Sequence, residues 1–244
     1  VVISAKGQFR TKKTVNNNYK ADICVYGGTA SGVMAALAAH QEGSTVILVE
    51  PTRWLGGMTG GGINHLDWGK GETVGGSTYK ILMDGLKDQK RAHGGHAKHG
   101  IGNKQYRERF KKLVKDRGIT VIYDHRVGKV QVGDEIINKP TREQPITLGE
   151  KIVSKNKNNS IRSIILDYAP VDETGCPIPE PKKRNVITVS AKVFIDCSYE
   201  GDILGMSGVR YTWGRESREH YDESLAGVRP SLWIHDVDPY VEPG

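Results

Sequence analysis

The pattern of apolar and polar positions predicts three elements close together in the first fifty residues. Residues 21–26 form a short apolar run that ends in glycine, which predicts a buried strand. Residues 29–42 carry apolar side chains at helical spacing, and Gly43 follows as a stop signal. A second apolar strand is predicted at residues 45–49. Strand, glycine turn, helix and parallel strand in one stretch of about thirty residues indicate a right-handed βαβ unit.

The later pattern continues an α/β arrangement. A glycine-dense loop occupies residues 56–62, and amphipathic helices are predicted at residues 78–91 and 104–117. Further strands are predicted at residues 119–123, 127–132, 163–168, 186–190 and 192–196. Residues 133–160 are polar with little periodicity, which favours a meandering hairpin region or an excursion from the core. The strands around the proline-rich loop at residues 172–181 are expected to form a smaller sheet.

Composition narrows the class of protein. The chain has 244 residues, of which 37% are hydrophobic and 26% charged, as in ordinary soluble globular proteins. Its 30 glycines are clustered rather than periodic, which excludes a collagen-like sequence. The net charge of +7 favours an anionic ligand or partner, but the basic residues are scattered over what is expected to be a solvated surface. No aromatic residues are interleaved with them, which argues against a nucleic-acid partner.

Cysteine usage indicates neither a metal site nor a disulfide framework. Cys24, Cys176 and Cys197 are far apart and form no CxxC pair. Cys24 and Cys197 lie in apolar runs and are predicted to be core residues, whereas Cys176 is predicted to be accessible.

Neither a membrane span nor a retained targeting segment is indicated. No stretch approaches the ~20 apolar residues that a membrane-spanning helix needs. The chain begins with two valines, and its polar first residues would suit an exported protein, periplasmic or extracellular, whose signal has been removed.

The strongest chemical motif is Gly27-Gly28-Thr29-Ala30-Ser31-Gly32, between the first strand and the helix. Main-chain amides and a helix N-terminus at such a turn can face a pyrophosphate. The usual spacing is Gly-x-Gly-x-x-Gly, and Thr29 occupies the second glycine position. A tight turn without a ligand is the alternative interpretation. Glu50, at the end of the second strand, can accept hydrogen bonds from adenosine ribose hydroxyls and disfavours NADP, so the combination predicts dinucleotide binding.

A second glycine loop, Leu55-Gly56-Gly57-Met58-Thr59-Gly60-Gly61-Gly62, favours one dinucleotide over another. A simple nicotinamide-binding domain needs no such loop, whereas the longer FAD molecule requires close backbone approach along its length. A flexible loop is the alternative, although the apolar residues Trp54, Leu55 and Met58 argue against it.

With these motifs together, the chain resembles bacterial FAD-dependent oxidoreductases. They belong to the glutathione-reductase-like, two-dinucleotide-binding flavoprotein superfamily. The resemblance spans roughly residues 21–244. It is carried by Val25-Tyr26-Gly27-Gly28-Thr29-Ala30-Ser31-Gly32, Leu48-Val49-Glu50-Pro51, Leu55-Gly56-Gly57-Met58-Thr59 and Phe194-Ile195-Asp196-Cys197-Ser198-Tyr199-Glu200-Gly201-Asp202, with similar segments at residues 211–216 and 223–228. Members often carry Thr at the position of Thr29.

The family resemblance implies a set of FAD-binding residues. It implies pyrophosphate contacts from Gly27, Gly28, Ala30, Ser31 and Gly32. The other implied residues are Glu50 at the adenosine ribose with Pro51 next to it, Arg53 near the adenine, Gly56, Gly57, Met58 and Thr59 along the flavin, Val127 with main-chain contacts to adenine, and Ser198, Gly201 and Asp202. Related succinate dehydrogenases attach FAD through a histidine whose place falls at Leu55, so non-covalent FAD is expected.

The resemblance also implies a domain organisation. The expected fold class is α/β, with a three-layer Rossmann-like FAD-binding domain and a small β-rich excursion. The expected divisions are a polar leader at 1–20, the FAD-binding core at 21–125, the excursion at 126–190, and at 191–244 a return to the FAD domain with the start of a substrate domain. The family's closing Gly-Asp element has no second counterpart here, so the remainder of a longer polypeptide or a second subunit is expected to complete the FAD and substrate sites.

The expected activity is FAD-dependent oxidation or reduction of a small organic substrate, with hydride transfer to or from the flavin. His65 is the candidate proton acceptor, although a structural hydrogen bond in a turn is the competing interpretation. His93, His96 and His99 lie in a glycine-rich connection without nearby carboxylates, so no metal site is expected. Two alternatives stay open, namely a non-catalytic assembly subunit that keeps the fold and an NAD-binding dehydrogenase domain.

Overall fold

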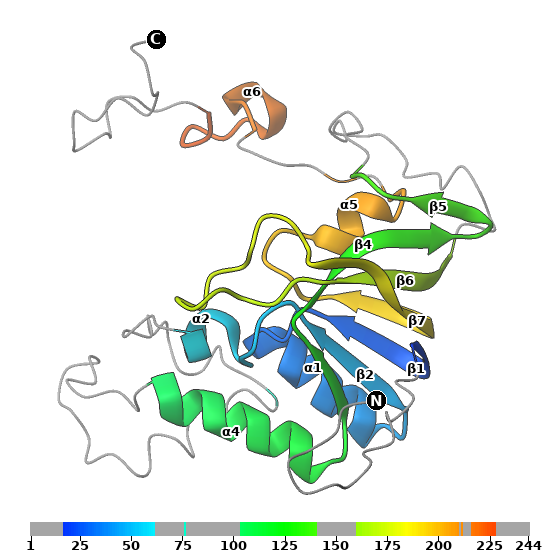
Figure 1. Ribbon diagram of the computed structural model, residues 1–244. Helices are drawn as coiled ribbons and strands as arrows, with labels where there is room; N and C mark the ends of the chain where they lie inside the picture. The colour runs from blue at the N-terminus through cyan, green and yellow to red at the C-terminus, as the bar shows by residue number, and fades with distance from the viewer. Residues whose placement is uncertain are drawn as a thin grey trace, which may run out of the picture.

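A single seven-stranded sheet forms the centre of the protein in the computed structural model, which describes residues 17–61, 76, 103–140, 160–209, 211 and 216–227 (Figure 1). The strands lie in the order β3-β2-β1-β7-β6-β4-β5. Their bounds are β1 Asn18–Tyr26, β2 Val46–Glu50, β3 Thr120–Tyr123, β4 His125–Val132, β5 Glu135–Ile137, β6 Ile161–Tyr168 and β7 Lys183–Asp196. The described helices are α1 Ala30–Gln41, α2 Gly57–Gly61, α4 Asn103–Asp116, α5 Asp202–Met206 and α6 Arg218–Tyr221.

One half of the sheet is parallel and the other half is antiparallel. β3, β2, β1 and β7 pair in parallel, as the βαβ pattern predicts, and β7, β6, β4 and β5 continue the sheet in antiparallel pairs. Parallel neighbours require crossover connections, and α1 supplies the one between β1 and β2. The sheet therefore joins a Rossmann-like core to the predicted β-rich excursion.

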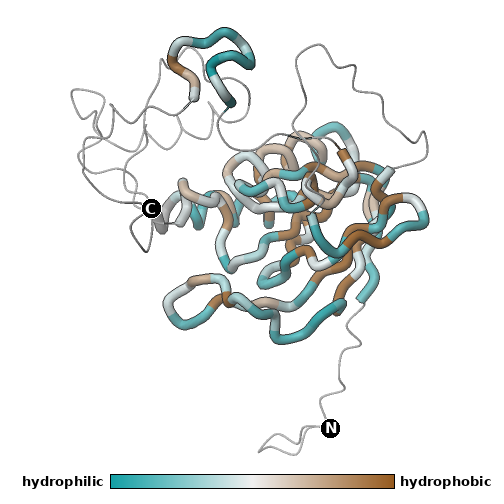
Figure 2. The backbone as a smooth tube through the Cα atoms, turned by 90° about the horizontal axis from the view of Figure 1, so that it is seen from above, coloured by the Kyte–Doolittle hydropathy of each residue, from teal (hydrophilic) through white to brown (hydrophobic). Residues whose placement is uncertain are grey.

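Side chains of the parallel strands alternate between two apolar layers. Val25 and Leu48 pack with α1 and α4 on one face, whereas Cys24 and Val49 pack on the other face with α5 and the antiparallel strands. Successive side chains of a strand point to opposite faces, so a continuous apolar run fills both layers. Figure 1 shows α1 and α4 on one side of the sheet and α5 on the other, and Figure 2 shows hydrophobic segments in the interior of the described part. The predicted three-layer α/β fold is confirmed.

The predicted smaller sheet is not separate from the main one. Residues 183–196 form one continuous strand, β7, instead of the two strands expected at 186–190 and 192–196. Its residues 188–190 pair with β1 on one side and with β6 on the other. Because both neighbours hydrogen-bond the same stretch, the strand passes from the excursion into the core without a break.

Local boundaries follow the sequence signals with small shifts. Thr29 and Glu42 cap α1, in agreement with the predicted limits of that helix, and Gly118 at φ +66° follows α4. β1 begins at Asn18 and includes the end of the predicted leader, because Asn18 pairs with Thr188 of β7. Part of the predicted glycine loop forms the one-turn helix α2, in which the Gly60 amide donates to the Gly56 carbonyl at 3.2 Å. The predicted helix at residues 78–91 lies outside the described residues.

Candidate functional site

Two glycines, Gly27 in the turn after β1 and Gly32 in the first turn of α1, lie where backbone atoms approach each other closely. Gly27 has φ +91°, and a Cβ on it would lie 2.6 Å from the Ser198 amide nitrogen. A Cβ on Gly32 would lie 1.9 Å from the Gly27 carbonyl oxygen. Positive φ and contact with backbone both favour glycine, since neither can be relieved by moving a side chain. The first turn of α1 is thereby held directly against the end of β1.

Thr29 has a structural role that explains its presence at the second glycine position. Its hydroxyl accepts the Gly32 amide at 3.2 Å, and donates to the Cys197 carbonyl at 2.9 Å. The side chain is buried and caps α1 while linking it to the end of β7. The backbone amide of Ser31 has no acceptor among the described residues, so it remains available at the positive end of the helix.

Glu50 lies at the end of β2, next to this turn. Its Oε2 atom accepts the Gly28 amide at 2.7 Å, and its Oε1 atom accepts the amide and the hydroxyl of Thr52, each at 2.6 Å. Burial raises the pKa of the Glu50 carboxyl, and the hydrogen bonds from Thr52 and Gly28 oppose that shift. A carboxylate has about four acceptor positions, of which the protein uses three here. One position is left for a ligand hydroxyl.

The second glycine loop is attached to the first. The Gly56 amide donates to the Gly28 carbonyl at 2.8 Å, and Gly57 has φ +50°. Leu55 is almost fully buried between the loop and the core, where a Cβ on Gly28 would meet its side chain at 2.6 Å. The Met58 amide donates to the hydroxyl of Tyr199, 141 residues away, at 2.7 Å. The first glycine turn and the second glycine loop, which α1 and β2 separate in the sequence, therefore lie next to each other in the structure.

Arg53 and Trp54 form the outer part of this region. Arg53 Nε lies 3.1 Å from Asp124 Oδ1, in an ion pair at the ends of β2 and β3. The Arg107 guanidinium lies 4.9 Å from the centre of the Trp54 ring. Arg53 therefore lies beyond Glu50 at the end of β2, and its place near the adenine stays a prediction.

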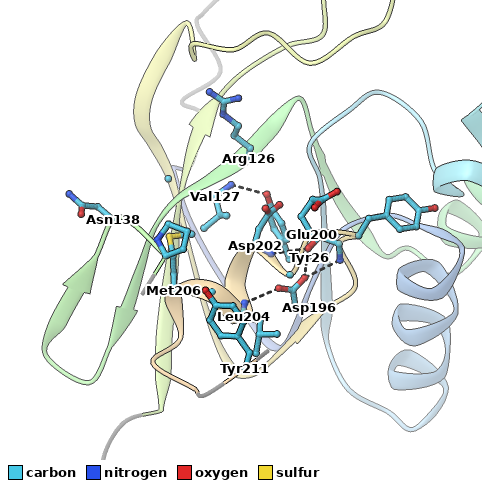
Figure 3. A pocket seen from close by; sticks show the side chains of 16 residues that line it. Tyr26, Arg126, Val127, Asn138, Asp196, Glu200, Asp202, Leu204, Met206 and Tyr211 are labelled. Atoms are coloured by element: carbon cyan, nitrogen blue, oxygen red, sulfur yellow. Dashed lines mark hydrogen bonds between the residues drawn. The ribbon is translucent and has the colours of Figure 1, made fainter. Parts of the chain in front are cut away.

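The segment after β7 is held in place by Asp196. Its Oδ1 atom accepts the amide and the hydroxyl of Ser198 at 3.0 and 2.6 Å, and its Oδ2 atom accepts the amides of Ile203 and Leu204 at 2.8 and 2.9 Å. The Ser198 hydroxyl also accepts the Asp202 amide at 3.0 Å. Figure 3 shows Asp196 at the centre of these contacts. The turn between β7 and α5 is therefore closed by its own hydrogen bonds.

A pocket of about 870 Å³ lies on the α5 side of the sheet. Burial raises the pKa of the Tyr26 hydroxyl, and the nearby Asp202 charge adds to that shift. This hydroxyl accepts the Val127 amide at 3.1 Å, so the main-chain donor predicted to meet adenine already has a partner inside the protein. Burial also raises the pKa of Asp202, with a further contribution from the charge of Asp196. In Figure 3 the Tyr26, Val127 and Asp202 groups lie together at this pocket.

The predicted site residues thus fall into two groups. The first group is connected through the Gly28–Glu50 and Gly28–Gly56 contacts. It comprises Gly27, Gly28, Ala30, Ser31, Gly32, Glu50, Gly56, Gly57 and Met58, with Pro51, Arg53 and Thr59 adjoining in sequence. The second group lines the pocket on the α5 side and comprises Val127, Ser198, Gly201 and Asp202. Ser198 joins the groups, because its amide lies against Gly27. The candidate proton acceptor His65 lies outside the described residues.

Sequence reasoning missed Tyr26, Thr52 and Tyr199 as members of the site. Each interacts through a hydroxyl whose partner is distant in sequence or supplied by a turn. The available signal for Tyr26 was a polar atom at the end of an otherwise apolar strand, since a buried tyrosine hydroxyl usually finds a partner.

Two further features concern metals and membranes. Among the described residues, no group of three or more histidine, cysteine or acidic side chains is arranged to hold a metal ion. None of the described helices has both the length and the apolar character that crossing a membrane requires.

Comparison with known proteins identifies one family model, described as FAD dependent oxidoreductase, which matches residues 22–151 and 178–242. A search of curated proteins gave no match. Similar solved structures include a flavoprotein/dehydrogenase from Cytophaga hutchinsonii, with 14% identity and a TM-score of 0.44 over 80% of this chain and 44% of that one. A geranylgeranyl bacteriochlorophyll reductase-like protein from Thermoplasma acidophilum has 12% identity and a TM-score of 0.40 over 73% and 39%.

A flavocytochrome c3 fumarate reductase in its open conformation has 19% identity and a TM-score of 0.39 over 73% of this chain and 33% of that one. The chain therefore spans less than half the length of each of these three proteins.

Proposed function

This chain belongs to the FAD dependent oxidoreductase family, and on that premise we propose that it supplies the dinucleotide-binding part of an enzyme that oxidises or reduces a small organic substrate. The observation that supports the proposal is the position of Glu50. Its carboxylate is hydrogen-bonded to the phosphate-binding turn at Gly28 and retains one acceptor position.

The residues present fit FAD. The orphan Ser31 amide and the N-terminus of α1 suit the pyrophosphate, and the remaining acceptor position of Glu50 suits an adenosine ribose hydroxyl. The loop at Gly56 and Gly57 continues from the first turn, because the Gly56 amide donates to the Gly28 carbonyl at 2.8 Å. Gly57 has a positive φ, and a Cβ there would lie 2.2 Å from the Tyr199 hydroxyl and 3.2 Å from the Thr29 Cα, so the packing of this loop against Tyr199 and the start of α1 itself requires glycine.

FAD, when bound, supplies the redox chemistry, which in this proposal is hydride transfer with the substrate. The chain itself binds and orients the cofactor through main-chain amides and one carboxylate. His65 stays a prediction as the group that takes the substrate proton.

We further propose that FAD is held non-covalently and that additional polypeptide completes the cofactor and substrate sites. Leu55 occupies the place of the attachment histidine in related enzymes and is buried in the core, where it offers no nucleophile. Support for additional polypeptide comes from the length of the similar structures, of which this chain spans less than half.

The proposal is tested by purifying the intact protein, with any polypeptide that accompanies it, and titrating the apoprotein with FAD while following flavin fluorescence. Saturable one-to-one binding of FAD, with all flavin released by acid precipitation, is the expected result. Flavin that stays on the precipitated protein would show covalent attachment. Binding of NADH in preference to FAD would support a dehydrogenase domain, and binding of neither would support an assembly subunit. Either result would overturn the proposed function.

A further inference from the structure

Tyr199 makes a contact that the family assignment does not account for. Its hydroxyl accepts the Met58 amide at 2.7 Å, although its side chain lies on the turn after β7 and Met58 lies in the second glycine loop. A Cβ on Gly57 would lie only 2.2 Å from the same hydroxyl oxygen. The phenol therefore lies directly over Gly57, which itself lies against Thr29 at the start of α1.

The base from which Tyr199 projects is firmly held. Asp196 accepts four hydrogen bonds from the residues on either side of Tyr199, and Ser198 accepts a fifth from Asp202. A turn fixed in this way presents the phenol in one place, so less conformational entropy is lost when its hydroxyl bonds the second glycine loop.

The exposure of Tyr199 distinguishes this arrangement from a tyrosine that only fills the core. The residue is 58% exposed and Met58 is 52% exposed, yet the hydrogen bond between them spans two motifs of the site. An interaction between such exposed groups adds little to global stability, because water competes for both partners. Its main effect is to fix the position of the loop.

We propose that Tyr199 is a positioning residue for FAD, whose hydroxyl keeps Gly57 and Met58 beside the N-terminus of α1 in the arrangement that receives the cofactor. This inference rests on the proposed function. Without the hydroxyl, the loop keeps the Gly56–Gly28 hydrogen bond at its start but loses its attachment at Met58. The loop then samples other positions, and FAD binding must restore the competent one.

The test compares Tyr199→Phe with the wild-type intact protein in two measurements. Hydrogen exchange of the peptide that contains Met58 is measured on the apoprotein, and the Kd for FAD is measured by fluorescence quenching. Loss of one neutral hydrogen bond, worth ~1 kcal/mol, predicts up to about five-fold faster exchange and up to about five-fold weaker FAD binding. The free energy of unfolding of the apoprotein is expected to fall by no more than the same ~1 kcal/mol.

The matched control is Tyr221→Phe, which removes a hydroxyl from a similarly exposed tyrosine on α6. It should alter neither measurement. A Tyr199→Phe protein with wild-type exchange and wild-type FAD affinity would overturn the inference while leaving the proposed function intact. Faster exchange with unaltered FAD affinity would also overturn it, because the contact would then be structural only. If the wild type itself fails to bind FAD, both proposals are wrong.

A second variant tests the same contact from the other side. Gly57→Ala places a methyl group against the Tyr199 hydroxyl, so it should weaken FAD binding. Adding Tyr199→Phe removes the oxygen at 2.2 Å but leaves the ring carbon at 3.0 Å and the positive φ of residue 57. The double variant should therefore relieve part of the clash and bind FAD at least as tightly as Gly57→Ala alone. Additive losses in the double variant would contradict the arrangement.

Discussion

The backbone amide of Gly28 donates to the Oε2 atom of Glu50 at 2.7 Å, which joins the turn after the first strand to the end of the second. The side chain of Glu50 therefore has a structural role that does not depend on a ligand. It satisfies the amide of a turn that would otherwise hold an unpaired donor in a buried position, and it satisfies Thr52 with its other oxygen. The residue predicted to bind ribose is therefore also part of the framework of the site.

Replacing Glu50 should accordingly affect stability as well as cofactor binding. Glu50→Ala leaves the amides of Gly28 and Thr52 without their acceptor, and we expect a loss of about 1–3 kcal/mol in the free energy of unfolding. Glu50→Gln keeps one carbonyl oxygen and should lose less. Urea unfolding of the apoprotein measures the stabilities, and equal stabilities of the two variants would contradict the structural role.

The raised pKa of Glu50 predicts a specific pH dependence. Because burial raises its pKa above the ordinary value of 4.5, the folded state holds more of this proton than the unfolded state does at pH values between the two pKa values. The contribution of this group to stability is present below the ordinary pKa and is lost as the pH rises through the folded-state pKa.

The measurement is the free energy of unfolding of wild type minus that of Glu50→Gln, followed from pH 4 upward. Subtracting the variant removes the contribution of every other titrating group that the two proteins share. The difference should decline with rising pH and then become constant. A difference that grows with pH would show that the hydrogen bonds, rather than burial, control this carboxyl.

The glycines of the site differ sharply in whether they can be replaced by alanine. Gly32→Ala would place a methyl group 1.9 Å from the Gly27 carbonyl oxygen, and both positions are fixed by the packing of α1 against β1. We expect loss of the folded state or a destabilisation of several kcal/mol, as for other severe overpacking.

Gly61→Ala is the matched control, since a Cβ there meets nothing within 4 Å and φ is not positive. It should be neutral or stabilising by up to about 1 kcal/mol. Circular dichroism and urea unfolding compare them, and a folded Gly32→Ala protein of wild-type stability would be inconsistent with this packing.

Local sequence pattern was sufficient to predict the elements that carry the first turn. β1, α1 and β2 follow from apolar periodicity and a terminal glycine, both of which act within a few residues. The continuity of β7 could not be predicted in this way, because it depends on hydrogen bonds to two strands from distant parts of the chain. Pairing partners are set by tertiary contacts, which a one-dimensional pattern does not encode.

The same distinction holds within the candidate site. Glycines and Glu50 could be predicted because their spacing along one βαβ unit dictates where they meet. The contacts of Tyr199 with Met58 and of Tyr26 with Val127 join residues more than one hundred positions apart. They arise only when β7 and β4 are placed beside β1, so their discovery required the structure.

The three cysteines provide a test of the fold that needs no substitution. Burial raises the pKa of the Cys24 thiol to about 12, whereas Cys176 is exposed and Cys197 is only half buried, contrary to its predicted core position. The thiolate is the reactive form, so alkylation of the native protein at pH 8 should be fastest at Cys176, slower at Cys197 and slowest at Cys24. Peptide mass spectrometry over time gives the three rates.

Cofactor binding should change one of these rates. Cys197 lies at the end of β7, where its carbonyl accepts the Thr29 hydroxyl and its Cβ lies close to Gly32 at the start of α1. FAD bound at this turn is expected to cover Cys197 and slow its alkylation more than that of Cys176, whose neighbour Gly175 packs against Trp54 at the outer part of the region. Protection of Cys176 instead of Cys197 would place the ligand elsewhere. Rapid labelling of Cys24 in folded protein would show that the first strand is not in the core.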